Sequence, residues 1–352
     1  MANDHYIPAS LLGRFSTEDT GRARERKVWA LKHGEQKAQY KKAEKYGSQQ
    51  NFYDLLMTQY AQMPRVVDKT WLAYENHLGS VLETLRTNTD RYALDANSWL
   101  AVLIPFVASL FVRGPDFNER YEARAGIKEI YSSMAKKDPA YPGDNTNMAR
   151  LMEFQRLLSP IMAASWTVLH TGGKLSLLTN ERGYTLYKPT GTDQIGWLIP
   201  TGRDMALAIM PTAVNHGRAI ITDTGIAKWK AILQHRTIND KDTAGFNRAI
   251  AGVASNFVIG PSEASVSNMA KDLQHKPLPA KYIYHNVPPS AVLRLHEHSW
   301  HYLLSEIKFS AIDKRLVADL QQSTGFILRG STISFFLTDS GTPNPLQFTQ
   351  RS

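Results

Sequence analysis

The chain has 352 residues, which is enough for one large core or two smaller ones, and its composition is that of a folded protein. It contains no cysteine, which excludes disulfide bonds, thiolate zinc sites and cysteine nucleophiles. Its formal net charge of +9 favours polyanionic partners such as nucleic acid.

No basic region followed by an apolar core stands at the N-terminus, so we expect no secretory signal. The longest apolar run, Trp99 to Val112, contains Pro105 and is shorter than the roughly 20 residues that a membrane-spanning helix needs. We therefore expect a cytoplasmic protein with no membrane partner.

The N-terminal segment begins extended at His5 to Pro8 and continues as a short helix, because Leu11, Leu12 and Phe15 have helical spacing. A strand follows at Lys27 to Leu31.

Between Arg14 and Lys45 lie ten Lys or Arg residues against five acidic ones, with Trp29 and Tyr40 among them. Such a stretch can bind phosphates and stack on bases. A solvated hairpin and helix surface explains the same pattern.

Helical patterns dominate the next hundred residues. Apolar spacing from Phe52 to Arg86 predicts two helices divided at Met63-Pro64, and Asp95 or Asn97 can cap the buried helix over Trp99 to Val112. Further helices are expected over Phe117 to Ala135 and Met148 to Leu169. The segment Lys136 to Asn147 is rich in helix-breaking residues and predicts a linker or mobile loop.

The stretch from Lys174 to Pro211 predicts a small, mostly antiparallel sheet. Its expected strands are Leu175 to Thr179, Tyr184 to Tyr187, Gly196 to Pro200 and Met205 to Met210. The last two are separated by Thr201 to Asp204, a tight turn.

The remaining elements alternate in type. A strand is expected at Ala219 to Ile221, and helices near Ile226 to Leu233, over Asp240 to Phe257 and over Ala291 to Ile307. Weaker strand patterns lie at Gly325 to Leu328 and Thr332 to Leu337. Together these elements predict an α+β fold, with a helical N-terminal half packed on the small sheet. We expect a main domain over residues 1–285 and a C-terminal appendage over residues 286–352.

Common catalytic motifs are absent from the sequence: it has no phosphate-binding glycine loop, no HExxH pair and no Gly-x-Ser-x-Gly elbow. His296, His298 and His301 cluster with Glu297, but a polar helix surface explains them better than a metal site. No metal site is therefore predicted, and the sequence names no cofactor and no oligomeric state.

Several short motifs resemble a known family. They are His5-Tyr6-Ile7-Pro8 with Leu12 and Phe15, Trp29, Asn51-Phe52-Tyr53, Arg113-Gly114-Pro115, Thr179 to Gly183, and the segment with Asn247, Ala254, Phe257 and Val258. Over residues 5 to about 260 the chain resembles the bacterial family catalogued as domain of unknown function 4238. In that family the central motif reads Thr-Ser-Asp-x-Pro, so Glu181 stands here in place of aspartate and Gly183 in place of proline. The resemblance supplies positions and no reaction.

From charge and from polar residues at turns, the leading hypothesis is a nucleic-acid-binding or nuclease-like effector. His5, Arg113 and Glu181 are its candidate catalytic residues, as base, anion clamp, and acid or orienting group. Asn51, Arg203 and Asn247 are its candidate substrate-binding residues. Two alternatives stay open: a non-enzymatic protein-interaction module, and an enzyme on a small anionic substrate held by Arg113 and Arg203.

Overall fold

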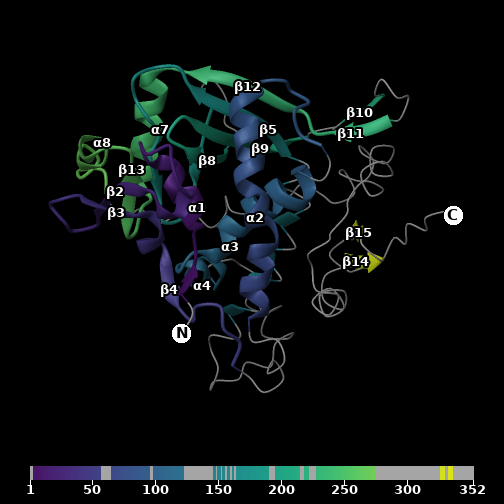
Figure 1. Ribbon diagram of the computed structural model, residues 1–352, viewed down its shortest axis with the longest axis horizontal. Coiled ribbons are helices and arrows are strands. Elements are labelled where there is room, and N and C mark those ends of the chain that lie inside the picture. Colours follow the sequence, from purple (N-terminus) through teal and green to yellow (C-terminus); the bar gives the residue numbers. More distant parts are fainter. Residues whose placement is uncertain are drawn as a thin grey trace.

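The computed structural model describes residues 3–56, 65–95, 98–122, 146–189 except 148, 152, 155, 156, 159, 160, 162 and 163, then 195–214, 218–221, 227–273, 326–329 and 332–335. In these ranges the chain is an α+β protein with helices and mostly antiparallel sheets (Figure 1), as the sequence predicts. The division at residue 285 and the histidines at 296–301 lie outside them. No helix within them is both long and apolar enough to cross a bilayer.

The larger sheet has five strands in the order β12-β5-β9-β8-β7. Its strands are β5 Ala164–Thr171, β7 Thr185–Tyr187, β8 Gly196–Gly202, β9 Met205–Val214 and β12 Leu233–Ile238. Only the β12–β5 pair is parallel. The predicted turn between Gly196 and Met210 is confirmed, because β8 and β9 pair antiparallel around it.

The smaller sheet joins segments that are far apart in the sequence. Its order is β3-β2-β13-β6, all antiparallel, with β2 Lys27–Lys32, β3 Gln39–Lys42, β6 Thr179–Asn180 and β13 Phe257–Gly260. Strand β13 thus joins the N-terminal hairpin β2–β3 on one side to β6 and the central turn on the other.

Two-stranded antiparallel pairs complete the described strands. They are β1 Asn3–His5 with β4 Ser48–Gln50, β10 Arg218–Ile221 with β11 Ala227–Lys230, and β14 Phe326–Arg329 with β15 Thr332–Phe335. The strands predicted at residues 219–221, 325–328 and 332–337 are therefore confirmed to within a few residues.

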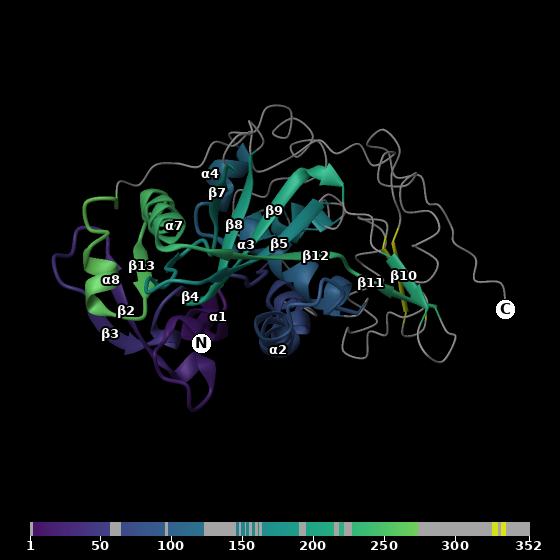
Figure 2. The ribbon, with the colours of Figure 1, turned by 90° about the horizontal axis from the view of Figure 1, so that it is seen from above.

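The helices pack on both sides of the larger sheet. The α-helices are α1 Ala9–Leu12, α2 Val66–Thr87, α3 Ile104–Arg113, α4 Phe117–Glu122, α7 Asp240–Gly252 and α8 Glu263–Ser267. A π-helical segment, Ser98–Leu103, runs into α3, and short 3-10 helices occupy Gly13–Phe15, Ala23–Glu25 and Ala43–Lys45. Figure 2 shows α2 on one side of β12 and α7 on the other.

Helix α3 is the centre of the core. Asp95 caps the segment that leads into it, because its Oδ1 accepts a hydrogen bond of 2.7 Å from the backbone N–H of Ser98. Trp99 then meets Trp166 of β5 at 4.5 Å between ring centroids, and Phe111 meets Trp197 of β8 at 4.6 Å. These large rings fix the buried helix against one face of the sheet.

Two predicted helices are wrong in part. Residues 164–169, expected to end a helix, form β5, whose side chains alternate between buried and half-buried from Ala164 to Val168. Residues 227–233, expected to be helical, form β11 and the start of β12. Their apolar residues fit a period of two as well as a helical spacing, so a short segment leaves the choice to its neighbours.

Candidate functional site

Arg113 occupies a buried position at the last residue of α3, where its side chain is 2% exposed. Its guanidinium donates to the carboxylate of Glu75 on α2 and to the backbone carbonyl of His5. It also lies 3.4 Å from the hydroxyl groups of Tyr53 and Tyr74. Burial acts to lower the pKa of Arg113, but Glu75 and the two phenols together raise it well above its ordinary value. The group is therefore a fixed cation whose donors are already bonded.

A second buried guanidinium closes the end of the same helix. Arg150 Nη1 lies 2.8 Å from the carbonyl oxygens of Val112 and Arg113 and 3.2 Å from that of Gly114. The last carbonyls of a helix lack partners within it and carry partial negative charge, so a cation there is stabilising. Arg150 thus holds the helix end that presents Arg113.

His5 at the end of β1 lies next to Arg113, with its ring oriented toward the hairpin. Its Nε2 is 3.2 Å from the carbonyl oxygen of Glu44. A carbonyl can only accept, so Nε2 carries the proton and Nδ1 holds the lone pair. Burial lowers the pKa of His5, and Arg113 acts in the same direction. A neutral histidine with an unprotonated nitrogen is the chemical form that can accept a proton.

Glu181 follows β6 and is 1% exposed. Its two carboxylate oxygens accept hydrogen bonds from the backbone N–H groups of Ser255, at 2.5 Å, and Phe257, at 3.2 Å. Burial raises the pKa of Glu181, although these bonds favour the charged form. Glu181 therefore links the turn after β6 to the start of β13 through these two hydrogen bonds.

The segment Tyr6–Ile7 connects the two groups. Burial of the phenol raises the pKa of Tyr6, and the charge of Glu181 acts in the same direction. Next along the chain, Ile7 packs near Gly183 in the turn after Glu181. The structure thus brings Arg113 into contact with the backbone of His5, and it places the turn that contains Glu181 and Gly183 against Ile7, two residues further along the chain.

The three candidate substrate-binding residues lie in different surroundings. Asn51 is exposed, with a φ of 51°, in the turn after β4. Asn247 on α7 is buried, and its amide accepts from Leu178 N–H and donates to the Ser176 carbonyl, both at 2.9 Å. Arg203, in the β8–β9 turn, donates to the Ser16 carbonyl at 2.9 Å and to Asp19 at 3.2 Å. Asn247 and Arg203 thus each fix a neighbouring backbone segment.

Sequence reasoning missed Tyr53, Tyr74 and Arg150 as members of this cluster. Tyr74 occurs on the expected apolar face of α2, where a buried hydroxyl group implies a buried polar partner. No sequence signal pairs Arg150 with a helix end 37 residues earlier.

None of the described ranges contains a group of three or more His, Asp or Glu side chains that could hold a metal ion. The group formed by His5, Arg113 and Glu75 therefore offers proton transfer at Nδ1 of His5, next to the buried ion pair of Arg113 with Glu75.

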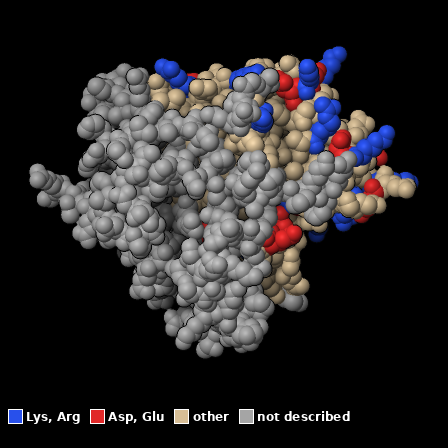
Figure 3. Space-filling model, turned by 180° about the vertical axis from the view of Figure 1, so that it is seen from behind, with Lys and Arg blue, Asp and Glu red and all other residues tan. Residues whose placement is uncertain are grey.

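A second candidate surface is the lysine hairpin, which we define as residues Lys27 to Lys45. It carries six exposed lysines: Lys27, Lys32, Lys37, Lys41, Lys42 and Lys45. Across the described part of the chain, none of the six forms an ion pair. In the view from behind (Figure 3), Lys and Arg side chains extend from the right margin, the side on which the hairpin lies.

Within the hairpin, Lys27 and Lys42 are direct cross-strand partners. Two like charges at such a position are destabilising. The same face carries Trp29 opposite Tyr40, whose rings stack with centroids 5.0 Å apart.

Comparison with protein-family models finds a match over most of the described chain. The family model described as Protein of unknown function (DUF4238) matches residues 3–264, which include the lysine hairpin, both buried arginines and the turn with Glu181. No curated protein and no solved structure matches the chain. The chain therefore belongs to the DUF4238 family, as the motifs from His5 to Val258 led us to expect.

Proposed function

We propose that this chain is a cytoplasmic nucleic-acid-binding protein and that the lysine hairpin is its contact surface. The observation that carries the proposal is the cross-strand pair of Lys27 and Lys42, neither of which forms an ion pair within the described residues. Exposed Lys41 lies on the opposite face of β3, and the carboxylate of Glu18 accepts a hydrogen bond from the backbone N–H of Lys27. A phosphate between the ammonium groups of Lys27 and Lys42 turns their repulsion into attraction. The formal net charge of +9 acts in the same direction at longer range.

The test is equilibrium binding of labelled DNA and RNA at several salt concentrations. We expect affinity to fall steeply as salt rises, because each phosphate contact releases condensed counterions. Lys42→Glu places opposite charges across the hairpin, so it should stabilise the fold slightly while lowering affinity about tenfold or more.

Lys241→Glu on α7 is the matched control, because it changes the charge equally at another exposed lysine. It should leave affinity nearly unchanged. Absence of binding at low salt, or equal losses in the two variants, would contradict the proposal.

A second candidate function is nuclease-like cleavage with His5 as the base. It is supported by the contact between His5 Nε2 and the carbonyl oxygen of Glu44, because Glu44 lies at the C-terminal end of the lysine hairpin. Cleavage of labelled DNA or RNA should then be lost in His5→Gln while binding remains. The test is run with and without Mg²⁺ or Mn²⁺, and beside Glu181→Gln.

The alternatives are less well supported. An enzyme on a small anionic substrate would use Arg113 and Arg203 as clamps, yet both guanidiniums are bonded within the chain. A protein-interaction module would use the same hairpin for an acidic partner. Lack of nucleic-acid binding, together with capture of an acidic protein that Lys42→Glu abolishes, would identify it.

A further inference from the structure

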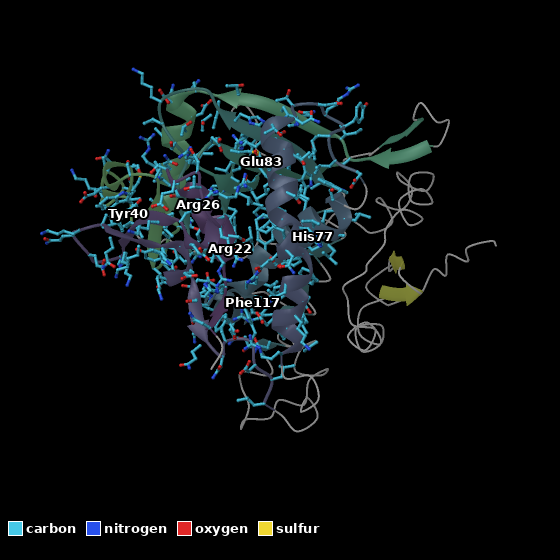
Figure 4. All side chains as sticks on the ribbon, in the orientation of Figure 1. Arg22, Arg26, Tyr40, His77, Glu83 and Phe117 are labelled. Carbon is cyan, nitrogen blue, oxygen red and sulfur yellow. The ribbon has the colours of Figure 1, made fainter. Side chains whose placement is uncertain are left out.

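The outer face of the lysine hairpin combines aromatic rings with ammonium groups. Tyr40 is 40% exposed at the edge strand β3, and Figure 4 labels it at the left margin of the molecule, away from α2. Its inner neighbour Trp29 pairs on the other side with Gly260 of β13. Tyr40 is thus the outermost ring of the sheet.

The ring of Tyr40 is held in place before any ligand binds. Its hydroxyl group donates to Glu18 Oε1 at 3.0 Å, and its plane lies 28° from that of Trp29. A ring fixed on two sides loses little conformational entropy when a flat partner stacks on it.

Two ammonium groups lie near this ring. Lys27 Nζ lies over the ring of Tyr40, 5.6 Å from its centroid, where a stacking base would displace it, and Lys42 follows Tyr40 on the same face of β3. A base stacked on Tyr40 would therefore place its own phosphates within reach of two cations. An unpaired base offers a free face for such stacking, whereas the bases of a duplex are already stacked on one another.

We infer that the hairpin selects single-stranded nucleic acid and that Tyr40 is the residue on which a base stacks. The inference rests on the proposed function, to which it adds the class of ligand. The lysines supply affinity for any phosphate backbone, and Tyr40 supplies the preference for unpaired bases.

The experiment compares single-stranded and duplex oligonucleotides of about 20 nucleotides, longer than the sites typical of single-strand binders. Wild-type protein should bind the single strand about tenfold more tightly than the duplex, and binding should quench tryptophan fluorescence. Tyr40→Leu keeps an apolar contact with Trp29 but has no aromatic face, so it should lose that preference. Tyr40→Phe keeps the ring and should retain it.

The outcomes separate this inference from the proposed function. Equal affinity for single strand and duplex, or Tyr40→Leu with wild-type preference, overturns the role of Tyr40 and leaves nucleic-acid binding intact. Failure to bind either form overturns both. A folding defect in Tyr40→Leu would appear as lost duplex binding, which an intact hairpin should preserve.

Discussion

The imidazole rings of His170 and His235 meet end to end across the parallel pair of β5 and β12. Nε2 of His170 lies 3.0 Å from Nδ1 of His235, and the ring planes differ by only 15°. With centroids 5.3 Å apart, the rings are joined through one shared hydrogen bond and do not overlap face to face. Nε2 of His235 is buried without a hydrogen-bond partner in the described structure.

This pair should make stability depend on pH. Burial lowers the pKa of both histidines, and His170 lowers that of His235 further, while Asp204 and Asp90 act in the opposite direction. Because the folded-state pKa values lie below the ordinary value of 6.5, the unfolded chain takes up protons first as pH falls. The stability contributed by the neutral pair is fully present above pH 6.5, the ordinary histidine pKa, and is lost as the pH falls from there through the folded-state pKa values.

Urea denaturation from about pH 7.5 to about pH 5 measures this effect. His235→Gln should show a smaller fall in unfolding free energy than the wild type. His77→Gln removes an exposed histidine from α2 and should keep the wild-type fall. The explanation fails if His235→Gln retains the full pH dependence.

The ion pair between Glu75 and Arg113 should contribute strongly to stability. Removing one charge of a buried pair leaves the other without compensation, so Glu75→Gln should lower the unfolding free energy by about 3 kcal/mol. Glu83→Gln on the same helix breaks ion pairs with Arg86 and, at 3.8 Å, with Arg14, and because Glu83 is half-exposed it should cost only about 1 kcal/mol or less. Both values come from urea denaturation, and similar losses in the two variants would contradict the assignment.

The sequence predicts a strand or turn well when its backbone groups form hydrogen bonds with residues nearby in the sequence, and poorly when those hydrogen-bond partners are distant. The sequence predicts the β8–β9 hairpin, and the structure confirms it, because turn chemistry and apolar runs are local. The run Leu175 to Leu178 has the composition of a strand but is not one, because its backbone bonds to Asn247, Asp240 and Arg203. Such partners lie far along the chain and leave no local pattern.

The candidate site shows the same limit. Charge and polar residues at turns make His5, Arg113 and Glu181 candidates, but the contact between His5 and Arg113 is long-range. Nothing in the spacing of Glu75 and Arg113, 38 residues apart, pairs them. Only the packing of α2 against α3 does so, and packing depends on the whole core.

Two glycines should respond in opposite ways to the same substitution. Gly183 has a φ of +74°, and a Cβ there would lie 3.0 Å from Leu110 and 3.2 Å from Ile7. Gly183→Ala should therefore destabilise the protein by more than about 1 kcal/mol.

Gly79→Ala lies within α2, where a Cβ would meet nothing within 4 Å. It should raise the unfolding free energy by about 0.5–1 kcal/mol. Thermal or urea unfolding measures both changes, and a neutral Gly183→Ala would show that the turn can relax.

Asn247 offers a test of whether a candidate binding residue is instead part of the framework. Its amide both accepts and donates, and aspartate of the same size can only accept. In Asn247→Asp the carboxylate would face the Ser176 carbonyl, so the unfolding free energy should fall by about 2 kcal/mol. Asn51→Asp makes the same change at an exposed turn whose positive φ suits both residues, and it should be nearly neutral. If Asn247→Asp instead leaves stability unchanged and abolishes nucleic-acid binding, Asn247 contacts the ligand and its bonds to Ser176 and Leu178 are dispensable.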